Sequence, residues 1–322
     1  MSRTKRIKAS IKEQPAFYLI TNRINNKEFL LDDEAKNYLT QQMLDIQKRF
    51  HCIIHSYTIL SNHYHAAIEI LPENDLSDEQ LLNYYRTHKR NETAIFPSET
   101  DKNQFLQNVH NLSHLVGYYQ QNVAQWFNRR GYANGKSRSG KFWQGRFDSQ
   151  LKENAREFLI AIGYITLNPL RAKMVKDPAE YQFCDYYQRR HNDIFRKSSE
   201  RLILLLSHEL GSDSHFDGDA NDYFNQLFDA FLMGLPLKKG DTWDQQTVGE
   251  YISGKDRADR QAWKQSFLEK NPAMTKSLAS GSYSFIVSTL EKFTSALGYK
   301  RPREPQPKNG WPGIFCIRKC RD

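Results

Sequence analysis

Short apolar and alternating runs predict three strands within the first 70 residues. Residues 16–24 (AFYLITNRI) are rich in β-forming side chains and are typical of a buried strand. Residues 52–60 (CIIHSYTIL) predict a second strand, and residues 63–70 (HYHAAIEI) predict a third in an alternating pattern. Only Ser61 and Asn62 separate the last two runs, so we expect them to form a hairpin.

Apolar positions spaced by three and four residues predict two helices in the same region. Asp32 is a favourable N-cap for a helix that runs to about Arg49. A longer amphipathic helix is predicted over residues 108–130. Its apolar stripe consists of Leu112, Leu115, Val116, Tyr119, Val123, Trp126 and Phe127. We expect such a stripe to pack against the sheet.

The remainder of the first 190 residues alternates between polar and apolar segments. Residues 72–104 are mostly polar, and we interpret them as an inserted excursion. A loop of Gly, Ser and Arg at 131–140 leads into a predicted strand at about 142–151. A last helix is predicted at about 154–167, because Pro169 forbids its continuation.

These elements follow the order βαββαβα, which is typical of the split-βαβ, ferredoxin-like arrangement. The predicted fold class is therefore α+β, with helices backing an antiparallel sheet. We expect a domain at 1–190 with an insertion at about 72–104. The segment 191–322 is predicted to be a mostly helical extension with a basic, Pro-rich tail from Tyr299. Its expected helices cover 199–210, 220–233, 260–269 and 283–297.

Composition narrows the class of protein. The chain has 322 residues, of which 39% are hydrophobic and 26% charged, and it can therefore build a sizeable core. No run approaches ~18 apolar residues, so we expect no membrane span. The basic N-terminus has no apolar run behind it, and no secretory signal is expected. Four scattered cysteines fit a reducing cytosol.

The net charge of +9 is distributed in bands. Residues 1–190 carry 27 basic and 20 acidic side chains, residues 191–250 carry 5 and 11, and residues 251–322 carry 14 and 6. Two basic zones indicate a polyanionic partner such as nucleic acid. A solubilising surface would explain the charge equally well.

The sharpest local feature is the sequence His63-Tyr64-His65. Residues two apart in a strand share a face, so both imidazoles point the same way with Cα atoms about 7 Å apart. Two neutral imidazoles at this spacing can converge on one cation. Taken alone, the pair is better explained as two half-exposed polar side chains.

The last predicted helix places Tyr164 and Asn168 on one face, four residues apart. A tyrosine hydroxyl near a cation can act as a nucleophile, because the cation stabilises the developing oxyanion. The Asn168 side-chain oxygen could be a third, harder ligand. The alternative is a core tyrosine and an asparagine that ends the helix before Pro169.

The sequence resembles that of a known family at several segments. The main ones are LSNHYHAAIEI (60–70), FWQGRFDSQL (142–151) and YITLNPLRAKMV (164–175), which occur in the family's order and at suitable separations. They resemble the REP-associated tyrosine transposases, within the HUH single-tyrosine transposase superfamily. Residues 20–34 and 120–131 are also similar, so the resemblance covers about residues 14–188.

The resemblance implies an enzyme that cleaves and joins single-stranded DNA at hairpin-forming repeats. His63 and His65 would hold a divalent cation, with Asn168 as the third protein ligand. Tyr164 would attack a phosphodiester to form a 5′-phosphotyrosine, and a second strand's 3′-OH could reverse the step. Family members use Mg²⁺ or Mn²⁺, and two imidazoles suit Mn²⁺ better.

Cations and rings near the end of the 108–130 helix predict a platform for a single strand. The candidate DNA-binding residues are Arg23, Arg129, Arg130, Lys136, Arg138, Lys141, Arg146 and Arg171. The nearby rings of Trp126, Trp143 and Phe147 also fit core positions, so the cations are the stronger candidates.

Three classes of function follow from these observations. The first is a DNA-cleaving and joining transposase, and the second is a catalytically silent DNA-binding regulator on the same fold. The third is a metal-dependent phosphodiesterase that activates water and uses Tyr164 only structurally. We expect a cytoplasmic, nucleoid-associated bacterial protein with single-stranded or hairpin DNA as its partner and no membrane partner. The pattern leaves the choice between monomer and homodimer open.

Overall fold

The computed structural model describes most of the first 210 residues and parts of the remainder. It covers residues 7, 9, 11–131, 140–210, 218–232, 277–297, 304–307 and 314–318. The chain divides into two compact units, and each is described by itself. The histidine unit, which carries His63, comprises residues 8–54 and 59–148. The tyrosine unit, which carries Tyr164, comprises residues 1–7, 55–58 and 149–322.

Two antiparallel strands, β1 (Ala16–Arg23) and β3 (His63–Ile70), pair along their full length in the histidine unit. The register runs from Ala16 opposite Ile70 to Arg23 opposite His63. β2 (Cys52–Ile59) precedes β3, and the Leu60 N–H donates to the His63 carbonyl at 2.8 Å across the turn. The three strands and the tight turn predicted from the sequence are confirmed.

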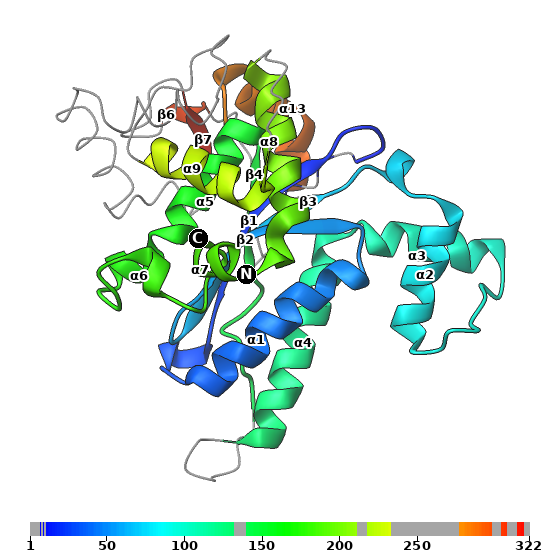
Figure 1. The fold of residues 1–322 in the computed structure, drawn as a ribbon. Coiled ribbons are helices and arrows are strands. Elements are labelled where there is room, and N and C mark those ends of the chain that lie inside the picture. The colour runs from blue at the N-terminus through cyan, green and yellow to red at the C-terminus, as the bar shows by residue number, and fades with distance from the viewer. Residues whose placement is uncertain are drawn as a thin grey trace. The chain divides into compact units, whose positions relative to one another are not determined.

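Two helices of the histidine unit, α1 (Asp33–Asp45) and α4 (Leu112–Arg130), lie side by side (Figure 1). The Asp32 carboxylate accepts a hydrogen bond from the Ala35 N–H at 2.9 Å, which confirms the predicted N-cap. α1 ends four residues earlier than predicted, because the chain tightens into a 3₁₀ turn at Ile46–Lys48. The predicted stripe of α4 is buried except at Trp126.

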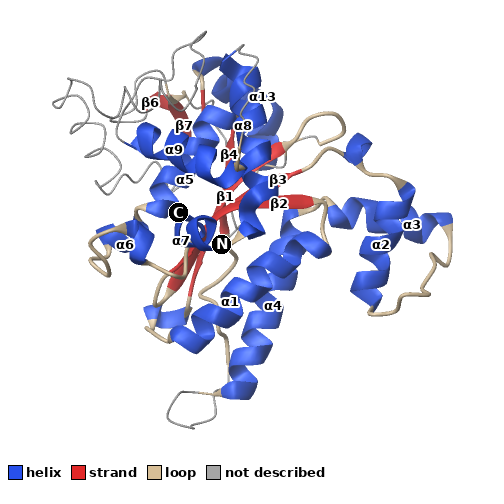
Figure 2. Ribbon diagram, viewed as in Figure 1, coloured by secondary structure: helices blue, strands red, loops and turns tan. Residues whose placement is uncertain are grey.

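The polar excursion predicted at 72–104 folds into two helices, α2 (Asp78–Lys89) and α3 (Glu99–Val109) (Figure 2). A capping box between Ser77 and Gln80 starts α2. The Tyr85 and Phe105 rings meet edge to face with centroids 5.2 Å apart, so the two helices share a small aromatic core.

The strand predicted at 142–151 is wrong over its first half. β4 (Asp148–Lys152) begins six residues later than predicted. Trp143 makes an isolated bridge to Ile24, and its indole N–H donates to the Gln120 carbonyl at 2.9 Å. These contacts hold the segment against the end of β1 and against α4, so it does not extend β4.

The tyrosine unit contains strands that the sequence did not predict. β4 pairs in parallel with β5 (Ser277–Gly281), and β5 pairs antiparallel with β7 (Phe315–Arg318). The two-residue β6 (Gln306–Pro307) also pairs with β7. β5 has the sequence SLASG, whose small side chains give no strand signal. Part of the predicted Pro-rich tail therefore forms sheet.

A buried polar cluster explains why β5 lies beside β4. The Lys152 ammonium donates to Gln150 Oε1 at 2.6 Å and to Ser280 Oγ at 2.9 Å. The Ser280 hydroxyl in turn donates to Glu157 Oε2 at 3.1 Å. Because Lys152 is only 2% exposed, its ammonium requires such partners, and Ser280 is the one that β5 supplies.

Helices make up most of the remaining tyrosine unit. They are α5 (Ala155–Thr166), α6 (Asn168–Arg171), α7 (Asp185–His191), α8 (Arg196–Leu210), α9 (Ala220–Leu232) and α13 (Tyr283–Leu297). The helices predicted at 154–167, 199–210, 220–233 and 283–297 are confirmed, and the one at 260–269 lies outside the described residues. Within the described part of the chain, none of the helices combines the length and apolarity that crossing a membrane requires.

The element order confirms the α+β class and the βαββαβα pattern, with α2 and α3 added before α4. The predicted boundary near residue 190 falls inside the tyrosine unit, at the end of α7. The division into a 1–190 domain and an extension stays a prediction.

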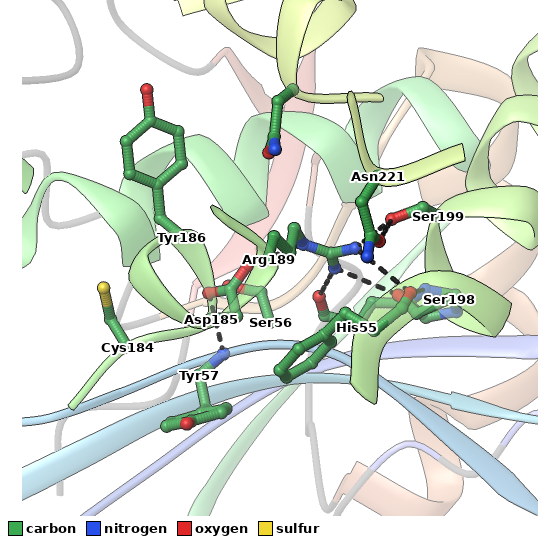
Figure 3. A network of polar contacts seen from close by, with 12 residues as sticks. His55, Ser56, Tyr57, Cys184, Asp185, Tyr186, Arg189, Ser198, Ser199 and Asn221 are labelled. Atoms are coloured by element: carbon green, nitrogen blue, oxygen red, sulfur yellow. Dashed lines mark hydrogen bonds and ion pairs between the residues drawn. The ribbon is translucent and has the colours of Figure 1, made fainter. Parts of the chain in front are cut away.

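A buried ion pair lies at the centre of a polar network in the tyrosine unit (Figure 3). Arg189 Nε and Asp185 Oδ2 are 3.3 Å apart, and their side chains are 0% and 2% exposed. The Asp185 carboxylate also accepts from the Ser56 hydroxyl at 2.6 Å and from the Tyr57 N–H at 3.1 Å. Burial raises the pKa of Asp185, and these donors together with Arg189 oppose that rise.

The Arg189 guanidinium uses its remaining donors on neighbouring elements. It donates to the His55 carbonyl of β2 and to the hydroxyls of Ser198 and Ser199 on α8. The Ser199 hydroxyl continues the network to Asn221 Oδ1 of α9 at 2.8 Å. One side chain of α7 thus connects β2, α8 and α9.

We predict that Arg189→Ala destabilises the full chain by about 3–5 kcal/mol or leaves the tyrosine unit unfolded, because Asp185 would keep a buried, uncompensated charge. Urea unfolding followed by circular dichroism measures this loss. Arg196→Ala is the matched control, since Arg196 and Glu200 form an exposed ion pair at the same four-residue separation. That variant should lose about 0.5 kcal/mol or less. Equal stability of the two variants would contradict the prediction.

Candidate functional site

The first and third residues of β3 bring two imidazoles together. The ring centroids of His63 and His65 are 5.2 Å apart, with their planes at 82°. His65 is buried at 4% exposure, whereas His63 is half-buried at the start of the strand. The two-residue period of the strand produces this pair, as predicted.

Asn62 fixes which nitrogen of His63 can bind a cation. Asn62 Oδ1 lies 2.6 Å from His63 Nδ1 and can only accept, so Nδ1 carries the proton. Nε2 then holds a lone pair. Burial, with a smaller contribution from the Arg23 guanidinium, lowers the pKa of His63 to about 4. The ring is therefore neutral at pH 7, as a metal ligand must be.

These residues fit a divalent cation with nitrogen ligands. A neutral imidazole with a hydrogen-bonded Nδ1–H is the usual arrangement of a metal-binding histidine. Among the residues that the structure describes, no three His, Cys, Asp or Glu side chains are grouped so that they could hold a metal. The donor set suits Mn²⁺ better than Mg²⁺.

In the tyrosine unit, the end of α5 and the short α6 bring Tyr164, Asn168 and Arg171 together. Asn168 Nδ2 donates to the Tyr164 carbonyl at 3.1 Å, which leaves Oδ1 of the amide as the acceptor. Arg171 Nη2 donates to the same carbonyl at 2.6 Å. The Tyr164 side chain is 8% exposed.

The candidate DNA-binding cations differ in their surroundings. Arg129, Lys141 and Arg146 are exposed, and Arg23 is half-buried opposite His63. Lys136 and Arg138 lie outside the described residues. Arg171 contacts Tyr164 in the tyrosine unit. Their roles in DNA binding stay predictions.

Arg130 makes strong contacts within the histidine unit. Its guanidinium donates to both oxygens of Asp32, at 3.0 and 2.5 Å, and lies 2.9 Å from Glu34. The hydrogen bond from Arg130 holds the pKa of the Asp32 carboxyl below its usual value. This bidentate pair joins the end of α4 to the start of α1, which is a structural role for Arg130.

The rings named from the sequence are not exposed stacking surfaces. Trp143 and Phe147 are buried, as is the neighbouring Phe142, and Trp126 stacks on Tyr38 with centroids 4.3 Å apart. Sequence reasoning missed Phe29, which is 80% exposed. A lone ring after the polar run Asn-Asn-Lys-Glu was the available signal.

The loop that carries Phe29 is held close to the histidine pair. Asn62 Nδ2 donates to the Lys27 carbonyl at 3.1 Å, and the Asn25 N–H donates to the Phe142 carbonyl at 2.8 Å. Asn26 and Lys27 both have left-handed backbones, with φ of 55° and 59°. Two successive non-glycine residues in this region are strained, and such strain is concentrated at functional sites.

Comparison with known proteins gives one distant similarity. No protein-family model matches the chain, and no curated protein matches it. A solved structure of a REP-associated tyrosine transposase bound to a REP hairpin is 13% identical, with a TM-score of 0.36. The match covers 60% of this chain and 88% of that chain. At this distance, the assignment of residues rests on the contacts above.

We predict that Asn62→Ala weakens Mn²⁺ binding by about 10–100-fold, because His63 would lose the partner that fixes its tautomer. Isothermal titration of the full chain with Mn²⁺ measures the affinity. Asn62→Asp keeps an acceptor for His63 Nδ1 and should bind Mn²⁺ at least as well as the unaltered chain. Asn83→Ala, at an exposed position of α2, is a control for general effects. Unchanged affinity in Asn62→Ala would refute the role of Asn62.

Proposed function

We propose that this protein cleaves and rejoins single-stranded DNA through a covalent 5′-phosphotyrosine on Tyr164, in the manner of a transposase. The observation that supports this best is the His63–His65 pair. Asn62 fixes the tautomer of His63, and the ring of His63 is neutral at pH 7. Two imidazoles this close, one of them with its lone pair on Nε2, form a site that a divalent cation can occupy.

In the proposed step, Tyr164 is the nucleophile and the 3′-oxygen of the cleaved DNA is the leaving group. The phenolic oxygen of Tyr164 forms a bond to phosphorus as the bond from phosphorus to the 3′-oxygen breaks. The 3′-oxygen leaves with the electron pair and takes up a proton, while the phenolic proton passes to solvent. The phosphotyrosine retains the ester, so a 3′-OH can reverse the step without ATP.

His63 and His65 would hold the divalent cation, and the resemblance to the family adds Asn168 as the third protein ligand. When bound, Mg²⁺ or Mn²⁺ polarises the scissile phosphate and stabilises its developing charge. Asn168 keeps its side-chain oxygen available because its Nδ2 is committed to the Tyr164 carbonyl.

The burial of Tyr164 supports a second candidate function. At 8% exposure, Tyr164 also fits a structural residue. The protein would then be a metal-dependent phosphodiesterase in which the histidine pair activates water. Cleavage would release free 5′-phosphate ends, and no covalent adduct would form.

We predict that Tyr164→Phe abolishes the covalent adduct, lowering its yield by at least about a hundredfold, because phenylalanine lacks the nucleophilic oxygen. The assay incubates the full chain with 5′- and 3′-labelled hairpin DNA and Mn²⁺ and separates the products on denaturing gels. Tyr283→Phe is the matched control, since Tyr283 is 54% exposed in the same unit. Cleavage that survives in Tyr164→Phe would support the phosphodiesterase. Binding without any cleavage would support a silent regulator.

We also predict that Phe29→Ala weakens single-stranded DNA binding by about 1–3 kcal/mol, because an exposed ring near basic side chains offers a stacking surface for a base. Fluorescence anisotropy at fixed salt measures the affinity. Phe29→Trp should retain the affinity for DNA. Ile95→Ala is the control and should leave the affinity unchanged, because Ile95 is exposed (71%) but has no ring. Equal affinities of Phe29→Ala and the unaltered chain would exclude this stacking role.

A further inference from the structure

Arg171 makes two different contacts with Tyr164. Its guanidinium carbon lies 3.8 Å from the centroid of the tyrosine ring, which is the distance of direct stacking. Nη2 of the same group donates to the Tyr164 carbonyl at 2.6 Å. One planar cation therefore holds both the ring and the backbone of the candidate nucleophile.

The break between α5 and α6 places Arg171 in this position. Pro169 has no N–H, so the Ile165 carbonyl four residues earlier lacks its usual helical donor. The Thr58 hydroxyl donates to that carbonyl at 3.0 Å instead. The chain then turns into α6 (Asn168–Arg171), whose last side chain folds back over the ring of Tyr164.

The backbone around Arg171 is also fixed. The Arg171 N–H donates to the Leu167 carbonyl at 3.1 Å, and Asn168 Nδ2 shares the Tyr164 carbonyl with Arg171. A guanidinium presents its donors in a rigid plane, so it can stack and donate at once. A lysine at this position would keep the charge but lose the plane.

We infer that Arg171 is a positioning residue that restrains the ring of Tyr164 and thereby directs its hydroxyl oxygen. This inference rests on the proposed function, and it differs from the sequence prediction that Arg171 contacts DNA. A contact with a DNA phosphate needs only a cation that reaches the DNA backbone. A positioning role needs the planar stack.

The two roles make opposite predictions for substitutions of Arg171. A positioning residue affects the rate of the step, because a displaced nucleophile reacts slowly even when DNA is bound. A phosphate contact affects affinity and its salt dependence, and lysine largely replaces arginine there. Arg171→Lys therefore separates them.

The test compares Arg171→Lys and Arg171→Ala with the unaltered full chain. We expect both variants to form adduct at least about tenfold more slowly with saturating DNA. Affinity for labelled single-stranded DNA, and its slope against salt, should stay unchanged. Arg156→Ala removes an exposed cation from α5 of the same unit and should match the unaltered chain in both measurements.

A second readout does not depend on cleavage. 3-Fluorotyrosine placed at position 164 reports the ring by ¹⁹F NMR without DNA or metal. We expect one shifted resonance in the unaltered chain and in Arg156→Ala. In both Arg171 variants, we expect the resonance to move from its position in the unaltered chain, and the melting temperature of each variant verifies that it is folded.

Several results would overturn the inference. It fails if Arg171→Lys reacts as fast as the unaltered chain, or if the ¹⁹F resonance is the same in all variants. It also fails if Arg171→Ala loses affinity and its salt slope falls by about 1. If no protein forms an adduct but the resonance moves as expected, the proposed function fails and the restraint of the ring by Arg171 stands.

Discussion

Four consecutive residues of β2 make the polar contacts on which the tyrosine unit depends. The His55 carbonyl accepts from Arg189, and the Ser56 hydroxyl and Tyr57 N–H donate to Asp185. The Thr58 hydroxyl donates to the Ile165 carbonyl that Pro169 leaves without a helical donor. Because Asp185 and Arg189 are almost fully buried, loss of either partner would leave a costly unpaired charge. The same four residues thus hold the helices around α7 and support the break that carries Tyr164.

The parts of the fold that the sequence predicted are those with strong local patterns. β1, β3, α4 and α5 combine a clear period with recognisable caps or breakers, and their bounds agree with prediction to within a few residues. β5 and β7 were missed because they are short and exist through pairing with distant segments. The sequence also did not predict that Arg189 is buried. An Asp and an Arg four residues apart in a helix give the same sequence pattern whether the pair is exposed or buried. Only the partners from β2, α8 and α9 show that this pair is buried.

The candidate site likewise has features that the sequence predicts and features that it does not. The histidine pair follows from the two-residue period of a strand. The shared face of Tyr164 and Asn168 stays a prediction, because α5 ends at Thr166 and Asn168 begins α6. The sequence could not show that Asn62 would orient His63, or that Arg171 would fold back onto Tyr164. Arg130, a predicted DNA contact, also pairs with Asp32, which is 98 residues away along the chain, and the sequence did not predict this pair. Such side-chain contacts depend on tertiary structure and have no signature in residue spacing.

The proposed function requires that Tyr164 becomes covalently attached to a DNA 5′-phosphate. The most direct measurement is tandem mass spectrometry of the protein after reaction with hairpin DNA and Mn²⁺, nuclease trimming and proteolysis. We expect a single modified peptide that contains Tyr164, with the nucleotide mass on that residue. A nucleotide on any other residue, or cleaved DNA with only unmodified peptides, would show that Tyr164 is not the nucleophile.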